Sequence, residues 1–221
     1  MYRNQFVAVI IPVLNEDESI GKVIADIPDF ADRIVVCDNG STDKTPNQVE
    51  QSKAELVFEN ERGYGAACLK ALSILDDRTD IIVFLDGDYS DYPEEMNLLL
   101  DPLLDNNCDV VIGSRMIKPE AKKHLTPVAR FGNWLSTCLI KIFWSYKFTD
   151  LGPFRAIKYE SFKKLKMVDR NFGWTVELQI KTAKMEMNAT EIPVSYRARL
   201  GKSKISGTLV GSFKAGARYY I

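Results

Sequence analysis

Five short apolar runs, separated by segments with helical periodicity, constrain the fold of this chain more than any other feature. They cover residues 6–13, 34–37, 56–58, 81–85 and 110–112. Continuous apolar runs of this length are typical of strands buried on both faces of a parallel sheet. Strands that alternate with helices predict an α/β fold, with a central and mostly parallel sheet flanked by helices.

The fourth run leads into an acidic stretch, IIVFLDGDYSDYP, over residues 81–93. Asp86 and Asp88 are two positions apart, so an extended chain points both the same way. Gly87 between them leaves room for a ligand near the backbone. Convergent carboxylates suit a hard cation such as Mg²⁺ or Mn²⁺, with Asp91 as a third candidate ligand. An ordinary acidic turn explains this stretch equally well when it is taken alone.

Polar clusters follow four of the five predicted strands. Because parallel strands present their carboxyl ends at one edge of a sheet, we expect these clusters to converge there. A turn or a helix cap would explain any one of them, whereas their joint placement favours a nucleotide site with a cation for its diphosphate. The clusters are Asn15-Glu16, Asp38-Asn39, Asp86-Asp88 and Ser114-Arg115.

The 221 residues predict a single domain. A net charge of −1 argues against nucleic acid as a partner. No signal peptide precedes the first strand, no apolar run is long enough to span a bilayer, and the four cysteines are scattered. We therefore expect a cytoplasmic location, with the cytoplasmic face of the membrane as a second option.

Residues 128–146 carry apolar side chains at helical spacing, from Phe131 and Trp134 to Phe143 and Tyr146. The ordinary interpretation is a helix that packs this stripe into the core, and the alternative is a helix that lies on a membrane surface. Residues 205–221 form a second amphipathic segment with the same two interpretations.

Eight segments together resemble the family 2 glycosyltransferases of the GT-A fold, and among them the polyprenyl- or dolichyl-phosphate sugar synthases. They occur in the expected order over nearly the whole chain. The segments are IIPVLNE (10–16), VVCDNGSTDKT (35–45), RGYGAA (62–67), FLDGDYSDYPEE (84–95), VIGSR (111–115), TDLGPFRAI (149–157), VELQIK (176–181) and EIPVSYRARLGKSKISG (191–207).

The resemblance implies a role for each matching donor-side residue. Pro12 and Glu16 would line the nucleoside pocket, while Asp38 and Asn39 would bind the base. Asn39 departs from the second Asp that the family usually carries. Gly63 and Gly65 would let the backbone approach the nucleotide.

For the metal, the resemblance implies that Asp86 and Asp88 form the metal-binding pair, with Asp88 as the direct ligand. Asp91 stands beside Ser90, which replaces a metal-binding Gln of the synthases, and would substitute for that Gln.

The resemblance also assigns the basic residues. Arg115, Arg130 and Arg155 match arginines that hold the acceptor phosphate or the donor. Lys204 matches a lysine near the diphosphate, and Arg199, with Arg197, would reinforce it. The implied activity is that of an inverting, metal-dependent hexosyltransferase. The resemblance also implies that residues 1–115 form a nucleotide-sugar-binding half of the domain and residues 116–221 an acceptor half.

The acceptor class depends on a general base. A hydroxyl acceptor needs one, usually the Asp of a Glu-Asp pair, and this chain has Thr175-Val176-Glu177 instead. A phosphate acceptor is already an anion, so the missing pair favours transfer from UDP-glucose or GDP-mannose to polyprenyl or dolichyl phosphate. Two alternatives remain: transfer to a glycan or lipid hydroxyl with Glu177 as base, and a non-catalytic subunit that binds nucleotide sugars.

Overall fold

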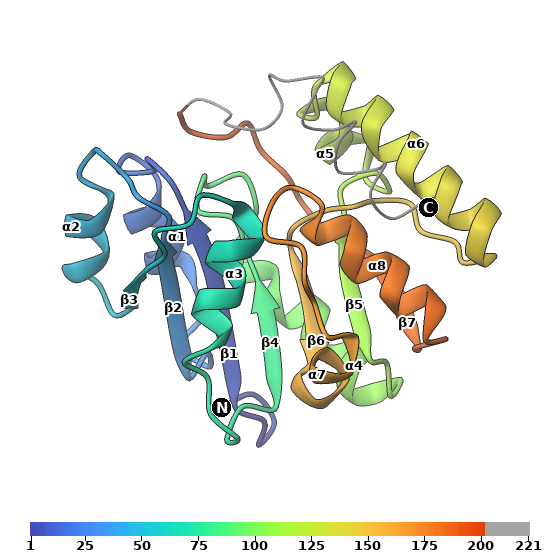
Figure 1. Ribbon diagram of the computed structural model, residues 1–221, viewed down its shortest axis with the longest axis horizontal. Coiled ribbons are helices and arrows are strands. Elements are labelled where there is room, and N and C mark those ends of the chain that lie inside the picture. The colour runs from blue at the N-terminus through green and yellow to red at the C-terminus, as the bar shows by residue number, and fades with distance from the viewer. Residues whose placement is uncertain (202–221) are drawn as a thin grey trace.

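The computed structural model of the protein describes residues 1–201, whose strands form one seven-stranded sheet (Figure 1). The strand order is β3-β2-β1-β4-β6-β5-β7. Every pairing is parallel except those of β6, which lies antiparallel between β4 and β5, so the predicted α/β fold with a mostly parallel sheet is confirmed. The strands are β1 (Val7–Val13), β2 (Arg33–Asp38), β3 (Glu55–Phe58), β4 (Ile81–Phe84), β5 (Val110–Ser114), β6 (Arg155–Lys158) and β7 (Ala189–Pro193).

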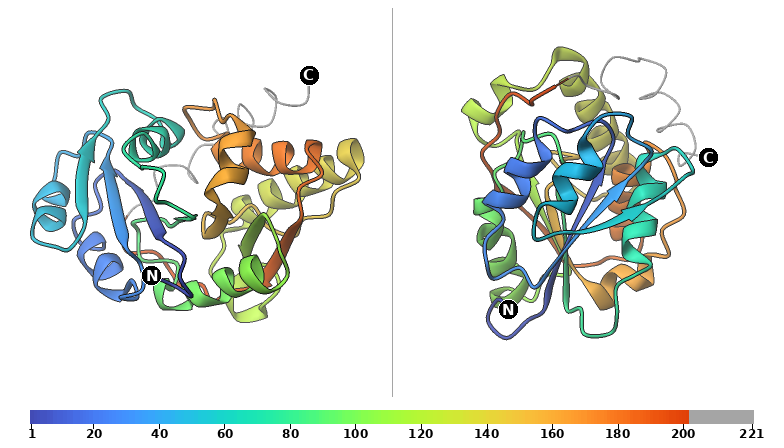
Figure 2. Two further views of the ribbon diagram at one scale, coloured as in Figure 1. Left: turned by 90° about the horizontal axis from the view of Figure 1, so that it is seen from below. Right: turned by 90° about the vertical axis from the view of Figure 1, so that its left-hand side faces the viewer.

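Helices cover both faces of this sheet (Figure 2). They are α1 (Ile20–Asp26), α2 (Thr45–Glu50), α3 (Tyr64–Leu72), the 3₁₀ helix η1 (Pro93–Glu95), α4 (Met96–Asp105), α5 (Pro119–Lys123), α6 (Pro127–Trp144), α7 (Tyr159–Leu165) and α8 (Trp174–Lys184). The short helices α2 and α5 were not predicted from the sequence, because neither is long enough to show an apolar period.

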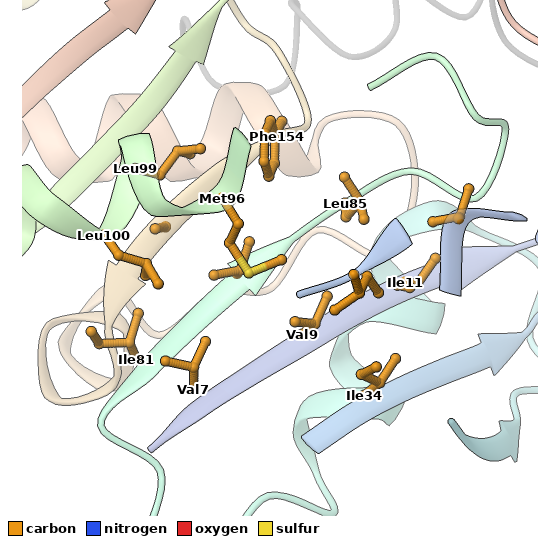
Figure 3. Close-up of a cluster of buried hydrophobic side chains, with 14 of the residues drawn as sticks. Val7, Val9, Ile11, Ile34, Ile81, Leu85, Met96, Leu99, Leu100 and Phe154 are labelled. Carbon is orange, nitrogen blue, oxygen red and sulfur yellow. The ribbon is translucent and has the colours of Figure 1, made fainter. Parts of the chain in front are cut away.

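Two apolar cores lie on opposite faces of the sheet because successive side chains of a strand point in opposite directions. Val7, Val9 and Ile11 of β1 pack against the helices α1 and α4 (Figure 3). Ile10 of the same strand points the other way, into the core formed with α3, α7 and α8. The continuous apolar runs of the sequence are explained by this burial on both faces.

One edge strand of the sheet contains a proline. Pro193 lies at the end of β7, and β7 is the last strand of the sheet. Proline cannot donate a ladder hydrogen bond, and an edge strand is a position where this loss is tolerated.

The prediction that α6 packs its apolar stripe into the core is wrong. Asn133, Thr137 and Ile140 are the buried residues of this helix, whereas Phe131 and Trp134 are 59% and 58% exposed. The reason is that Asn133 on the buried side of the helix forms hydrogen bonds with the loop at residues 149–151. Asn133 Nδ2 donates to the carbonyl of Thr149 at 2.8 Å, and its Oδ1 accepts from the amide of Leu151 at 2.7 Å.

No helix within residues 1–201 has both the length and the apolar character needed to cross a bilayer. The predicted amphipathic segment 205–221 and the predicted diphosphate-binding Lys204 lie outside the described residues.

Candidate active site

A cavity of about 330 Å³ opens at the carboxyl ends of β1, β2 and β4, the edge where the polar clusters were expected to meet. A volume of this size suits a small-molecule ligand. Eight residues singled out in the sequence line it: Pro12, Glu16, Asn39, Gly63, Asp86, Gly87, Asp88 and Arg199.

Arg199 lies between two acidic side chains of this cavity. Its Nη2 donates to Glu16 Oε1 at 2.8 Å, and its Nη1 lies 3.3 Å from Asp88 Oδ2. The backbone fixes the same arrangement, because the Leu200 amide donates to the Asp88 carbonyl at 3.0 Å and the Arg197 amide to the Ser90 carbonyl at 2.9 Å. The chain after β7 thus brings a guanidinium to the acidic loop after β4, about 110 residues away along the sequence.

Arg197 holds this acidic loop from its other side. Its guanidinium carbon lies 3.4 Å from the ring centre of Tyr89 and 4.2 Å from that of Tyr92. Its Nε donates to the Tyr89 carbonyl at 2.6 Å. These contacts stabilise Tyr89 in a left-handed backbone conformation, with φ of 63°, that a non-glycine residue rarely adopts.

The two carboxylates of the Asp-Gly-Asp turn have different partners. Asp86 Oδ1 accepts from the Tyr64 hydroxyl at 2.9 Å, and Asp88 Oδ1 accepts from the Ser90 amide and hydroxyl at 3.0 and 2.5 Å. Burial, followed by the negative charge of Asp88, raises the pKa of Asp86 to about 7. A bound cation would relieve this crowding of negative charge, so the pair fits a divalent metal ion.

Asp91 does not join this pair at the cavity. Its side chain is buried, both carboxylate oxygens are without a hydrogen-bond partner among the described residues, and burial raises its pKa well above the usual range. It is not among the residues that line the cavity. Within residues 1–201 no three Asp, Glu, His or Cys side chains converge to hold a metal, so the predicted three-carboxylate ligand set is not assembled.

Asp38 and Asn39 lie at the end of β2, where the resemblance implies base recognition. Asn39 uses its whole amide on the backbone: Nδ2 donates to the carbonyls of Glu59 and Glu61, and Oδ1 accepts from the Gly63 amide at 2.7 Å. Asp38 Oδ1 accepts from the amides of Gly40 and Ser41, while Oδ2 has no partner among the described residues. Asp38 therefore keeps an unpaired acceptor, and Asn39 shapes the wall of the cavity.

Gly63 and Gly65 allow a close approach between backbones. A Cβ atom at Gly63 would overlap the carbonyl oxygen of Arg170, and one at Gly65 would overlap that of Asp169. The Ala66 amide donates to the Arg170 carbonyl at 2.9 Å, so the start of α3 is joined to the loop before α8. Gly63 also lines the cavity, whereas the close neighbour of Gly65 is the protein itself.

The three predicted phosphate-binding arginines all form hydrogen bonds or ion pairs with other groups of the protein. Arg115 pairs with Asp150 through two bonds of 2.8 Å, and buried Arg155 donates to the carbonyls of Leu151 and Gly152. Burial lowers the pKa of Arg155 to about 10. Arg130 donates to the carbonyls of Lys122 and Leu125, between α5 and α6. None of the three is among the residues that line the cavity in the described part of the chain.

Glu177 is bonded to other groups of the protein. Its fully buried carboxylate accepts from the amides of Val168 and Asp169 at 2.9 and 2.7 Å, and it pairs with Lys181 at 2.7 Å. It is not among the cavity-lining residues. This geometry gives no support to the predicted alternative role of Glu177 as a general base.

Sequence reasoning missed several residues that line the cavity, among them Tyr64 and Phe172. Tyr64 stands between the two glycines of Gly63-Tyr64-Gly65, and this position could have identified it. Phe172, which is 42% exposed, comes from the loop before α8, where no sequence pattern marks it.

Comparisons with known proteins agree with this geometry. The sequence pattern of glycosyl transferase family 2 matches residues 8–166. An uncharacterized glycosyltransferase of Mycobacterium bovis is 35% identical over 210 residues, which cover 95% of this chain and 94% of that protein. A dolichyl-phosphate hexose transferase of Haloferax volcanii is 31% identical over 201 residues, 90% of this chain and 86% of that protein.

Among solved structures, glucosyl-3-phosphoglycerate synthase from Mycobacterium tuberculosis, in complex with Mn²⁺, UDP and glucosyl-3-phosphoglycerate, has a similar fold. The TM-score is 0.72 at 20% sequence identity, over 97% of this chain and 81% of that one. The predicted GT-A fold is thus confirmed by structure, and the predicted resemblance is confirmed by sequence. The chain belongs to glycosyl transferase family 2.

Proposed function

We propose that this protein transfers a hexose, with inversion, from UDP-glucose or GDP-mannose to a polyprenyl or dolichyl phosphate. One observation carries the proposal: the cavity combines a carboxylate pair and a guanidinium suited to a metal-bound diphosphate, while the candidate base Glu177 is bonded elsewhere. The name of the related Haloferax volcanii protein, a dolichyl-phosphate hexose transferase, supports the same acceptor class.

The donor would bind along the edge of the sheet. Asp86 and Asp88 would hold Mg²⁺ or Mn²⁺, which neutralises the negative charge of a diphosphate leaving group. Arg199, already within reach of Asp88, adds positive charge to the same end of the cavity. Glu16, which is bonded to Arg199 at this end, supplies oxygens for ribose hydroxyls. For the base, the candidate acceptor is the unpaired Oδ2 of Asp38, which is buried next to the cavity-lining Asn39 and is not itself among the lining residues.

A phosphate acceptor simplifies the chemistry required of the protein. Its oxygen is ionised at neutral pH, so it can attack the anomeric carbon while the bond to the nucleoside diphosphate breaks, without loss of a proton. A hydroxyl acceptor would need a base in contact with the substrate. Glu177 is fully buried and its carboxylate accepts two backbone hydrogen bonds. These surroundings do not suit a general base, which supports the phosphate acceptor over the hydroxyl alternative.

The direct test is a transfer assay with a labelled nucleotide sugar, Mg²⁺ or Mn²⁺, and polyprenyl phosphate in detergent micelles. The proposal predicts metal-dependent appearance of label in the organic phase, as an acid-labile lipid phosphate sugar. Label that reaches only water, glycans or proteins would contradict it. Donor binding without any turnover would instead support the alternative of a non-catalytic nucleotide-sugar-binding subunit.

A further inference from the structure

The outward side of α6 carries apolar side chains that the proposed donor and acceptor chemistry leaves unused. Val128, Phe131, Trp134, Ile142 and Phe143 are all exposed, and we call this set the α6 face. In residues 1–201, twelve large apolar side chains are exposed, and these are five of them. A concentration of this kind on one element is typical of a contact surface.

Helix α6 lies at the border of the molecule (Figure 1), and the α6 face extends along it. At a rise of about 1.5 Å per residue, its two ends lie roughly 22 Å apart. The inward side of the same helix buries Asn133, Thr137 and Ile140. The helix therefore turns two polar side chains and one apolar side chain toward the protein and leaves its large aromatic side chains outward, unlike a helix that packs its apolar stripe on its own core.

The charge around the α6 face identifies the kind of partner. Residues 116–149 contain six Lys or Arg residues and one acidic residue, Glu120. Lys122, Lys123 and Lys141 are exposed in or next to the helix. Exposed aromatic rings beside lysines match an anionic lipid surface, which takes the rings at headgroup depth and pairs with the cations. A second copy of the chain would oppose like charges instead.

We propose that the α6 face docks this protein on an anionic lipid bilayer. The inference rests on the proposed function, since a polyprenyl phosphate is held in a bilayer. The buried side of α6 connects the docking surface to the acceptor half: Asn133 bonds the backbone at Thr149 and Leu151, and Asp150 between them pairs with Arg115. Docking through α6 places this loop on the inner side of the helix, about 10 Å from the lipid, which is one helix diameter.

Vesicle co-sedimentation of the full chain tests the proposal, with phosphatidylcholine vesicles and with vesicles that also contain phosphatidylglycerol. The test variant is Phe131→Gln with Ile142→Gln. The matched control is Phe58→Gln with Val168→Gln, whose side chains are 56% and 66% exposed on other elements. We expect the partition coefficient on anionic vesicles to fall by at least about tenfold in the test variant. The partition coefficient of the control variant should stay within about twofold of the wild-type value. For the wild-type protein, the partition coefficient should decrease as the salt concentration rises.

Tryptophan fluorescence identifies what covers the face. Brominated lipids should quench the full chain, and most of this quenching should be lost in Trp134→Phe. Equal vesicle binding by the test and control variants would overturn the proposal. So would a Trp134 emission that is already blue-shifted without lipid and does not respond to vesicles, because residues 202–221 or a second copy would then occupy the face.

A water-soluble short-chain prenyl phosphate separates this inference from the proposed function. The test variant should use it at the wild-type rate and lose turnover only with the vesicle-embedded acceptor. If the wild-type protein transfers the sugar to the soluble acceptor but does not bind vesicles, the docking proposal alone would be overturned. Vesicle binding through the α6 face without transfer to either acceptor would contradict the proposed function alone.

Discussion

Asp88 and Glu177 are both buried carboxylates, yet only Asp88 lines the cavity. Asp88 contacts Arg199 in the cavity, whereas Glu177 of α8 is bonded to the backbone of the loop before that helix. Substitutions at these two positions therefore should have opposite signatures, one in turnover and one in stability.

Asp88→Asn removes one negative charge while an amide oxygen remains to accept from Ser90. We expect metal-dependent transfer to fall by at least about a hundredfold, because a cation contributes several kcal/mol to leaving-group stabilisation. The midpoint of thermal unfolding should change little. The exposed Asp29→Asn is a control for the loss of one charge, and full activity of Asp88→Asn would rule out its role at the metal.

Glu177→Gln should lower stability and leave the chemistry intact. The neutral amide no longer pairs with Lys181 and accepts less strongly from Val168 and Asp169, so urea titration should show a loss of about 1–3 kcal/mol. The kcat of the folded variant should stay within a few-fold of wild type. A drop in kcat of about a hundredfold or more, together with loss of a titrating base from the pH–rate profile, would restore the hydroxyl-acceptor alternative.

At the scale of elements, the strands of the first half could be predicted because each is an uninterrupted apolar run buried on both faces. The antiparallel insertion of β6 between β4 and β5 could not, because strand order depends on long-range pairing that local pattern does not encode. The orientation of α6 was predicted wrongly for a related reason. Its spacing indicates one apolar side, but whether that side meets the core or the surroundings depends on Asn133 and its loop.

The junction between α3 and the loop before α8 gives a prediction at this scale. Gly65→Ala should destabilise the protein by about 1–3 kcal/mol, because the new Cβ overlaps the Asp169 carbonyl and forces the junction apart. Gly132→Ala is the matched control, since its Cβ on α6 meets nothing within 4 Å and should stabilise the helix by up to about 1 kcal/mol. Urea unfolding of both variants measures the difference, and equal stability would contradict the close contact at Gly65.

At the scale of the whole molecule, the cavity collects residues from β1, the loop after β2, α3, the loop after β4, the loop before α8 and the chain after β7. The convergence of Glu16, Asn39, Asp86 and Asp88 could be predicted from sequence, because polar residues that end neighbouring parallel strands lie at one edge of the sheet. The arginines and Glu177 could not be assigned, because a motif match does not tell whether a side chain faces a ligand or its own backbone. Arg115 pairs with Asp150, and Arg155 donates hydrogen bonds to the carbonyls of its neighbouring loop.

A site assembled from so many segments should stabilise the whole fold when it is filled. At a ligand concentration of about 100 times Kd, a nucleotide sugar with Mn²⁺ should add about 2.7 kcal/mol, or roughly 5–10 °C in Tm. A panel of UDP- and GDP-sugars, each with and without Mn²⁺, identifies the base. The Asp88→Asn variant should lose the Mn²⁺-dependent part of the shift, and an equal shift in that variant would contradict the assigned metal pair.

The choice between acceptors tests the central claim most directly. Polyprenyl phosphate and the polyprenol of the same chain length differ only in the phosphate, and both are offered at equal concentration with one labelled donor and Mn²⁺. The account predicts that label enters the phosphate lipid at a rate at least about a thousandfold above the alcohol, since the candidate base Glu177 is bonded to backbone amides and does not line the cavity. Comparable label in the polyprenol, or label in the polyprenol alone, would contradict it.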